Sequence, residues 1–271
     1  PGWEFYSYRL PESLEAAQMT VQGRTGGSLE GVQVVARMSE DRRIDLTYHS
    51  PRCESGEHQQ ANHDAFIATE TLLGEEVLDK WVGLIEAAPT PQSKRLFGLF
   101  KKTSTSVPSM IPLDRLKPTV DALISSAVEQ LPHEPLHTFG DALKWTLYEL
   151  KPKQADDYSG QRDMFVGRTC VSRMWQDAHS GRSFYSERYS RCGETFCYVK
   201  LDGSQGLESE KFADKSEIED ALDAALVPKG LGRVIGGGTG LRYSYVDLAL
   251  ADLRPARSEE HTSELQSPNT N

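Results

Sequence analysis

The fold is decided by one segment near the end of the chain, Val234-Ile235-Gly236-Gly237-Gly238-Thr239-Gly240-Leu241-Arg242-Tyr243-Ser244-Tyr245-Val246-Asp247-Leu248. Four glycines in five residues are typical of a phosphate-binding loop. Such a loop needs a helix after it, because the helix N-terminus supplies the N–H groups that hold the phosphate. The residues that follow, 241–250, are rich in tyrosine, valine and leucine and indicate a β-strand. The segment therefore predicts a β-hairpin with residues 236–240 at its turn.

The rest of the chain repeats this combination of hairpins and helices. Apolar alternation predicts paired strands at residues 32–38 with 43–49, and at 183–190 with 195–201. Single strands are expected at 81–87, 142–150, 163–171 and 231–235. Helical spacing predicts helices at 63–79 and 113–131, and the capping box Ser216-Glu217-Ile218-Glu219 opens a third at 217–226. Antiparallel sheets built from hairpins with helices packed on them define an α+β fold, here with two related units.

Composition shifts suggest where these units begin and end. We expect a first α+β unit at 1–88, a proline-rich loop or linker at 89–112, and a helix and strand completing the first unit at 113–160. A second α+β unit is expected at 161–256. Residues 257–267 resemble the conceptual translation of a sequencing-library adapter, so we expect 257–271 to be a non-native tail.

The overall composition limits the classes of partner. The 271 residues carry a net charge of −10, which argues against a broad nucleic-acid or anionic-membrane surface. No apolar run reaches the length of a transmembrane helix. Four cysteines are few for this length, which favours reduced thiols and a cytoplasmic protein. The chain starts at Pro1, so the loss of a preceding signal peptide stays open.

One cluster has the residue types of a metal site: His49, Cys53, His58 and His63. Zinc binds sulfur and imidazole ligands, and one loop could supply all four. The spacing lacks the short paired knuckles that preorganise a zinc finger. The alternative is a solvated loop with scattered histidines, and no cofactor is predicted.

A second candidate is a reactive thiol at Cys192. This cysteine lies in an expected turn beside Arg191, whose charge would lower the thiol pKa. A Cys–His nucleophile would need a partner such as His179 within hydrogen-bond reach. The alternative is that the strand cysteines act as small apolar residues.

The glycine hairpin is the third candidate site. A glycine turn lets backbone N–H groups approach a ligand closely. The proposed ligand-binding residues are Gly236, Gly237, Gly238, Thr239, Arg242 and Tyr245. Asp247 lies in an apolar strand and needs a partner there, for which Arg188 or Arg233 could serve. The alternative is a tight turn with an edge-strand ion pair.

Three segments carry a family resemblance: Phe184 through Tyr198, the helix at 217–226, and the glycine hairpin with its strand. Together with Leu72-Leu73-Gly74-Glu75-Glu76 and Trp81-Val82-Gly83-Leu84-Ile85-Glu86, they resemble uncharacterised bacterial proteins with domains of unknown function. That resemblance implies a bacterial, cytoplasmic α+β protein and transfers no activity. The absence of common catalytic motifs and the tyrosines in the hairpins favour a non-catalytic module that binds another protein. A small-ligand-binding protein or enzyme with its site at the glycine hairpin is the alternative.

Overall fold

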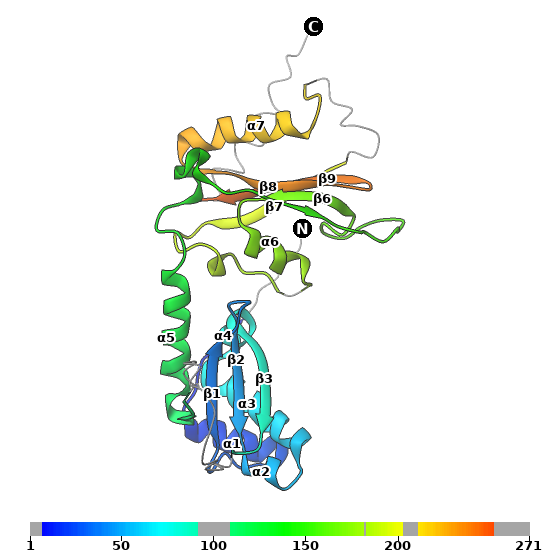
Figure 1. The fold of residues 1–271 in the computed structure, drawn as a ribbon. Coiled ribbons are helices and arrows are strands. Elements are labelled where there is room, and N and C mark those ends of the chain that lie inside the picture. The colour runs from blue at the N-terminus through cyan, green and yellow to red at the C-terminus, as the bar shows by residue number, and fades with distance from the viewer. Residues whose placement is uncertain (1–6, 92–108, 182, 203–210, 252–271) are drawn as a thin grey trace, which may run out of the picture. The chain divides into compact units, whose positions relative to one another are not determined.

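The structure is a computed structural model that describes residues 7–91, 109–181, 183–202 and 211–251. The chain divides into two compact units, Pro1–Ala127 and Val128–Asn271, each with helices packed on its own sheet. The fold is therefore α+β, as the hairpin pattern predicts (Figure 1). The division between residues 127 and 128 falls earlier than the expected one between 160 and 161, because residues 146–149 pair with the second sheet. The expected tail and most of the linker lie outside the described residues.

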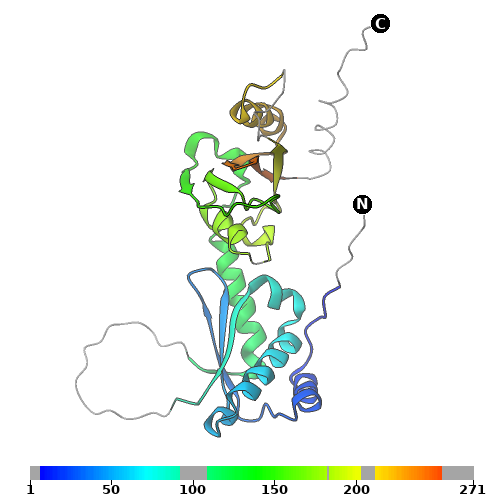
Figure 2. The same cartoon turned by 90° about the vertical axis from the view of Figure 1, so that its right-hand side faces the viewer.

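Unit 1 has a four-stranded sheet in the order β3-β2-β1-β4. Its elements are α1 (Leu14–Thr25), β1 (Gln33–Met38), β2 (Ile44–His49), α2 (Pro51–Glu54), α3 (His58–Leu73), α4 (Glu75–Trp81), β3 (Val82–Ala88), β4 (Ile111–Pro112), the 3-10 turn η1 (Leu113–Arg115) and α5 (Leu116–Glu129). The β1–β2 hairpin confirms the predicted pair, and Figure 2 shows it beside α3. In contrast to the expected antiparallel sheet, β3 pairs parallel to β2, because the helices between them form a crossover connection.

Helix α1 is the element of unit 1 that the sequence pattern does not reveal. Only Ala17 and Val21 of this helix are buried, so its sequence lacks a clear apolar stripe. Its ends are nevertheless defined by local chemistry. The Ser13 side chain accepts a hydrogen bond from the N–H of Ala16, and Gly26 ends the helix with a φ of 68°.

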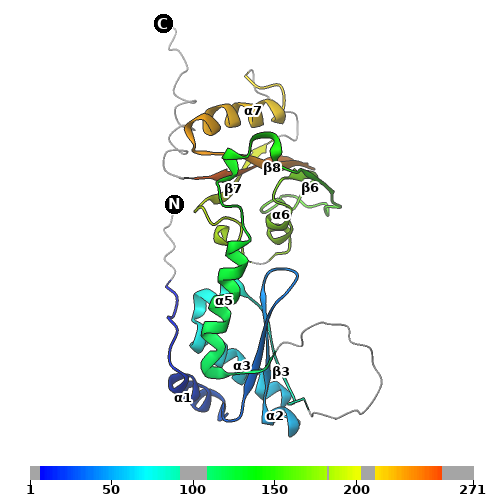
Figure 3. The same cartoon turned by 60° about the vertical axis from the view of Figure 1, so that its left-hand side comes forward.

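Unit 2 has a five-stranded antiparallel sheet in the order β5-β6-β8-β9-β7. Its elements are the 3-10 turns η2 (Leu136–Thr138) and η3 (Gly140–Ala142), β5 (Thr146–Glu149), β6 (Met164–Thr169), α6 (Ser172–His179), η4 (Ser186–Arg188), β7 (Thr195–Asp202), α7 (Lys215–Leu226), η5 (Val227–Lys229), β8 (Gly232–Gly240) and β9 (Tyr243–Leu250). Helices α6 and α7 lie on opposite faces of the sheet (Figure 3).

The two faces carry separate apolar clusters. On the α6 face, Trp175, Met164, Phe196 and Tyr245 belong to one buried cluster. On the α7 face, Leu226 packs with residues of β8 and β9 such as Val246. Strand residues alternate between the two clusters because successive side chains point to opposite faces.

Three local predictions for unit 2 need correction. Residues 183–190 contain the 3-10 turn η4, not a strand, and β7 pairs with β9. The sequence pattern does not predict the short helix α6. The cap of α7 is Asp214, whose carboxylate accepts from the N–H groups of Ser216 and Glu217, so the helix begins at Lys215 and not at residue 217 as expected. An aspartate is as good a cap as a serine, and the chain uses the earlier one.

Candidate functional site

The glycines lie inside strand β8, not at the turn that the sequence predicts. Gly236, Gly237 and Gly238 pair with both β6 and β9 in the interior of the sheet. The turn is formed by Leu241 and Arg242. Oδ2 of Asp163 accepts hydrogen bonds from the N–H groups of Arg242 and Tyr243, at 2.9 Å each. This carboxylate holds the turn at residues 241 and 242, directly after the glycine run.

The glycines leave room for neighbouring side chains on the α6 face. A side chain at Gly238 would place its Cβ 2.6 Å from Sδ of Met164. At Gly236, the added Cβ would lie 3.0 Å from Oδ2 of Asp247. Gly237 has a φ of 143°, which side-chain-bearing residues rarely adopt. Because Gly236 and Gly238 have no side chains, the side chains of Asp247 and Met164 can lie directly against strand β8.

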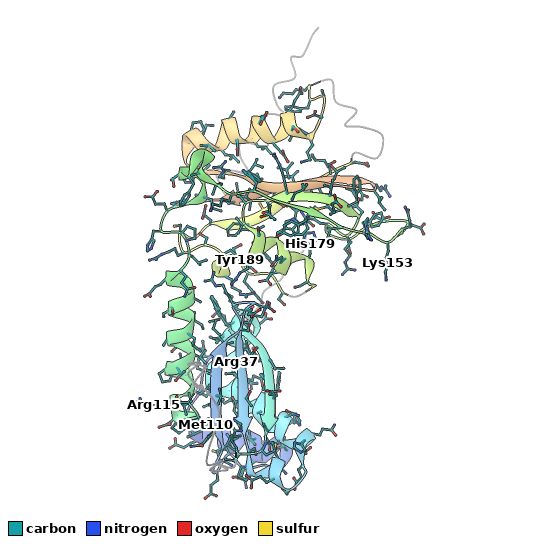
Figure 4. The ribbon with its side chains drawn as sticks, in the orientation of Figure 1. Arg37, Met110, Arg115, Lys153, His179 and Tyr189 are labelled. Atoms are coloured by element: carbon teal, nitrogen blue, oxygen red, sulfur yellow. The ribbon has the colours of Figure 1, made fainter. Side chains whose placement is uncertain are left out.

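A cavity of about 1170 Å³ opens on this face of unit 2. Met164 and Asp247 contribute from the sheet, and Trp175, Ala178 and His179 from α6. The loop at residues 150–162, Phe184 and residues 196–198 of β7 form further parts of the lining. Figure 4 shows His179 at α6 and Lys153 on the loop at the edge of the sheet. The walls are mainly apolar and aromatic, with a few polar groups, which is the usual composition of a small-molecule site.

Asp247 is the most buried charged group that lines the cavity, with only 5% of its surface exposed. Its Oδ1 accepts a hydrogen bond from Nε2 of Gln161 at 2.6 Å. Its Oδ2 has no hydrogen-bond partner among the described residues. Burial raises the pKa of Asp247 to about 6, although the Gln161 hydrogen bond and the charge of Lys215 act in the opposite direction. One residue that lines the cavity therefore carries a buried carboxylate oxygen without a donor among the described residues.

His179 presents a second unpartnered atom. Its Nδ1 lies 2.8 Å from the carbonyl oxygen of Trp175, which can only accept, so Nδ1 carries the proton. Burial lowers the pKa of His179, which favours the neutral ring. Nε2 is then an acceptor, and it has no partner in the described part of the chain.

Trp175 supplies the third such atom and holds His179 in place. The two rings stack with centroids 3.9 Å apart, and Tyr148 stacks on the other side of Trp175 at 4.2 Å. The indole Nε1 is buried without a hydrogen-bond partner among the described residues. Three residues that line one cavity thus each carry a buried polar atom with no partner among the described residues, which is unusual in a folded protein.

The exposed edge of the cavity is cationic. Lys151, Lys153 and Arg162 line it and are solvent-exposed. None of the three forms an ion pair within the described ranges. The lining carboxylate at the same edge, Asp157, accepts a hydrogen bond from Tyr243 at 2.8 Å. In a protein of net charge −10, this local excess of positive charge would attract an anionic group.

None of the six predicted ligand residues lines the cavity, the three glycines included. Tyr245 is fully buried, and its hydroxyl donates to Asp163 and lies 3.1 Å from the carbonyl oxygen of Gly160. Arg242 covers the ring of Tyr243, with Cζ 5.1 Å from the centroid. Thr239 pairs with Ser244 beside the turn. The expected partner of Asp247 is also different, because Arg188 pairs with Asp177 and Arg233 with Asp223.

The Cys192 thiol has none of the features of an activated nucleophile. Burial and the charge of Glu194 raise its pKa and outweigh the lowering effect of Arg191. Its Sγ lies 3.6 Å from the carbonyl oxygen of His133. His179 belongs to the cavity described above, whose lining does not include Cys192. The expected lowering of the pKa is therefore contradicted.

The four proposed metal ligands are not brought together. His49 ends β2 and its Nδ1 lies 2.9 Å from the carbonyl oxygen of Pro89, while Cys53 is buried in α2. His58 begins α3 and His63 lies more than a turn further on. Within the described ranges, no three His, Cys, Asp or Glu residues are grouped so that they could hold a metal ion. The helix at residues 58–73 separates side chains that the sequence places in one loop.

Comparison with protein-family models, with curated proteins and with solved structures gives no significant match. The resemblance to bacterial domains of unknown function thus stays a prediction. No helix in the described part of the chain combines the length and the apolar character that crossing a membrane requires.

Proposed function

We propose that unit 2 binds a small ligand in the cavity lined by α6, the loop at residues 150–162 and strand β7. The observation that carries this proposal is the Oδ2 atom of Asp247, a buried carboxylate oxygen with no donor, on a residue that lines the cavity. Burying a charged oxygen without a partner is costly, and proteins rarely do so outside sites where another group completes the hydrogen bonds. His179 and Trp175 support the same conclusion, since each adds an unsatisfied polar atom.

The residue types of the cavity favour binding over a particular reaction. The lining has a neutral imidazole and a buried carboxylate, and their hydrogen-bond partners are the carbonyl oxygen of Trp175 and the amide of Gln161, neither of which is a nucleophile. The glycine strand contributes space, because it lets Met164 and Asp247 lie against the sheet. We also propose that the protein works in a bacterial cytoplasm, for which the free state of Cys53, Cys170, Cys192 and Cys197 is the supporting observation.

The proposal is tested by filling the cavity. Ala178 lines the cavity and is exposed, so Ala178→Trp would occupy the space without changing a buried contact. Arg173→Trp, on the same helix but outside the lining, is the matched control. Fragments would be soaked into crystals of the full chain, and their binding measured by calorimetry. We expect fragments at Asp247 or His179 that Ala178→Trp excludes and Arg173→Trp retains; an empty cavity would contradict the proposal.

A second function, binding of another protein, is favoured by a different surface. Leu147 on the edge strand β5 is 68% exposed, and the nearby Trp145 and Phe165 are 43% and 41% exposed. An edge strand with apolar side chains can pair with a strand of a partner. Light scattering and affinity capture would compare the full chain with Leu147→Glu. A partner that the variant loses supports this function, while a monomer that captures none counts against it.

A further inference from the structure

Strand β5 leaves one backbone edge of the unit 2 sheet open. Among the described strands it pairs only with β6, at the end of the strand order. Beside this pairing, the N–H of Leu150 donates to the carbonyl oxygen of Phe165. Because alternate residues of an antiparallel strand bond to the same neighbour, the even-numbered residues bond to β6. Residues 145, 147 and 149 therefore direct their N–H and C=O groups to the outer edge, where they can pair with another strand.

This outer edge lacks a proline and a β-bulge, two features that often prevent strands from pairing. Residues 143–151 contain no proline, and the pairing of β5 with β6 has no register shift. On the α6 face the strand is held in place, since Thr146 accepts a hydrogen bond from Ser172 at 2.8 Å and Tyr148 stacks on Trp175. On the opposite face the central side chain, Leu147, is 68% exposed. The edge is thus already ordered for pairing and is apolar at its centre.

We propose that β5 pairs antiparallel with β5 of a second copy of this chain, about a two-fold axis at Leu147. Leu147 then lies opposite Leu147 of the second copy, and Trp145 lies opposite Glu149 on each side of the axis. Every outward N–H and C=O group of residues 145, 147 and 149 gains a partner. A two-fold axis is the commonest symmetry of homo-oligomers, and its interface must complement itself. This inference rests on the second function proposed above, since it names the partner of the same strand.

The charges beside the axis are complementary. Glu149 is exposed and forms no ion pair within the described residues. Across the axis its carboxylate meets Trp145, whose indole N–H is a donor. The guanidinium of Arg168 lies over that indole ring, with Cζ 4.8 Å from the centroid. Arg168 also pairs with Glu219 on α7, yet its side chain stays 50% exposed. Each carboxylate of the pair thus lies beside a donor and a cation of the other copy.

The neighbouring registers fit less well. Directly opposite residues of two antiparallel strands share one face of the sheet, so their side chains must be compatible. Moving the axis one residue forward would place Leu147 opposite Glu149, an apolar side chain against a charge. Moving it one residue back would place Glu149 opposite Leu143, which lies outside β5 and is half-buried in its own unit. The register centred on Leu147 avoids both mismatches and keeps every bonded residue within 145–149.

The oligomeric state of the full chain is the first test. Sedimentation over a range of concentrations should show a reversible monomer–dimer equilibrium. Leu147→Glu places two like charges opposite each other at the axis, so it should weaken the dimer about tenfold or more. Leu241→Glu, the same change at an exposed leucine in the turn after β8, is the matched control and should leave the dimer unchanged. Thermal unfolding of both variants would establish that they fold.

The register is tested by disulfide formation between copies. Opposite Cα atoms of a hydrogen-bonded antiparallel pair are about 5.5 Å apart, which is within the range of a disulfide. Leu147→Cys should therefore give a covalent dimer on oxidation with copper phenanthroline. Trp145→Cys and Glu149→Cys should each link poorly alone and should link to each other when the two variants are mixed. The parent chain, with its four cysteines, is the control for background cross-linking.

The possible failures are distinguishable. A chain that stays monomeric and does not cross-link through Leu147→Cys overturns the self-pairing. If this monomer captures another protein that Leu147→Glu loses, the protein-binding function stands without the self-pairing; if it captures none, both are overturned. A dimer that Leu147→Glu leaves unchanged also overturns the inference. Assembly beyond the dimer does so as well, because pairing about a two-fold axis closes after two copies.

Discussion

The side-chain amide of Gln161 donates a hydrogen bond to Oδ1 of Asp247 across 2.6 Å, and this is the one hydrogen bond that the described structure gives the buried carboxylate. Because burial raises the pKa of Asp247 to about 6, the folded state holds a proton that the unfolded state has already released. The stability of unit 2 should therefore fall as the pH rises from about 4 to about 6, by roughly 3 kcal/mol.

Asp247→Asn should remove this pH dependence. At pH 7 the variant is expected to be more stable than the parent, since a neutral amide replaces an unpartnered charge, and at pH 4 the two should be alike. Urea unfolding at pH 4, 5, 6 and 7 measures both curves. Asp220→Asn, on the exposed side of α7, is the control and should follow the parent. A parent whose stability rises through this range would contradict the raised pKa.

The class of the fold follows from the sequence, whereas the cavity does not. The hairpin at residues 33–49 and the last two strands come from short-range alternation, which is local information. Asp247 also stands out in the sequence as an acid in an apolar strand. Its partner is Gln161, on a loop that is 86 residues away along the chain. Such a contact depends on the order of the strands, which no local pattern encodes.

The sequence pattern does not predict two further features of unit 2, the position of the turn after β8 and helix α6. The turn after β8 is set by Asp163, whose hydrogen bonds to residues 242 and 243 cannot be read from the glycine run. Helix α6 has eight residues, too few for a clear helical period, so Trp175 and His179 could not be placed on one face. The sequence does contain one indication of this site. Trp175 and His179 are four positions apart, a spacing that places two side chains on the same face of a helix.

The Cys192 thiol should react slowly. Burial and nearby carboxylates raise its pKa, so less thiolate is present near neutral pH than for a free thiol. Iodoacetamide labelling at pH 7.5, followed by mass spectrometry, should show Cys192 modified more slowly than glutathione. Cys170, whose pKa burial raises to about 11, should react more slowly still. Labelling of Cys192 faster than glutathione would revive the reactive-thiol hypothesis.

The contribution of Asp163 to the stability of unit 2 should change with pH in the opposite direction to that of Asp247. Burial alone would raise its pKa, but hydrogen bonds from Tyr245 and from the N–H groups of Arg242 and Tyr243 lower it. The stabilisation by Asp163 is fully present above the pKa that its carboxyl has in the unfolded chain. It is lost as the pH falls through the lower pKa that the same carboxyl has in the folded state. Asp163→Ala removes the acceptor of the two backbone N–H groups and leaves Tyr245 only the carbonyl oxygen of Gly160, so it should cost on the order of 3 kcal/mol at pH 7. Asp156→Ala, which removes an exposed carboxylate on the same loop, is the control in the same urea unfolding assay and should change the stability little.

Two glycine substitutions should have opposite effects on stability. Gly238→Ala would place Cβ 2.6 Å from Sδ of Met164 and against the carbonyl oxygen of Val166, so the sheet must shift. We expect a loss of about 1–3 kcal/mol and a displaced Met164 in the cavity. Gly23→Ala, inside α1, meets no atom within 4 Å and should gain about 0.5–1 kcal/mol, because alanine loses less conformational freedom in a helix. Thermal unfolding of both variants measures the difference. A tolerated Gly238→Ala with unchanged ligand binding would show that the glycine strand does not shape the cavity.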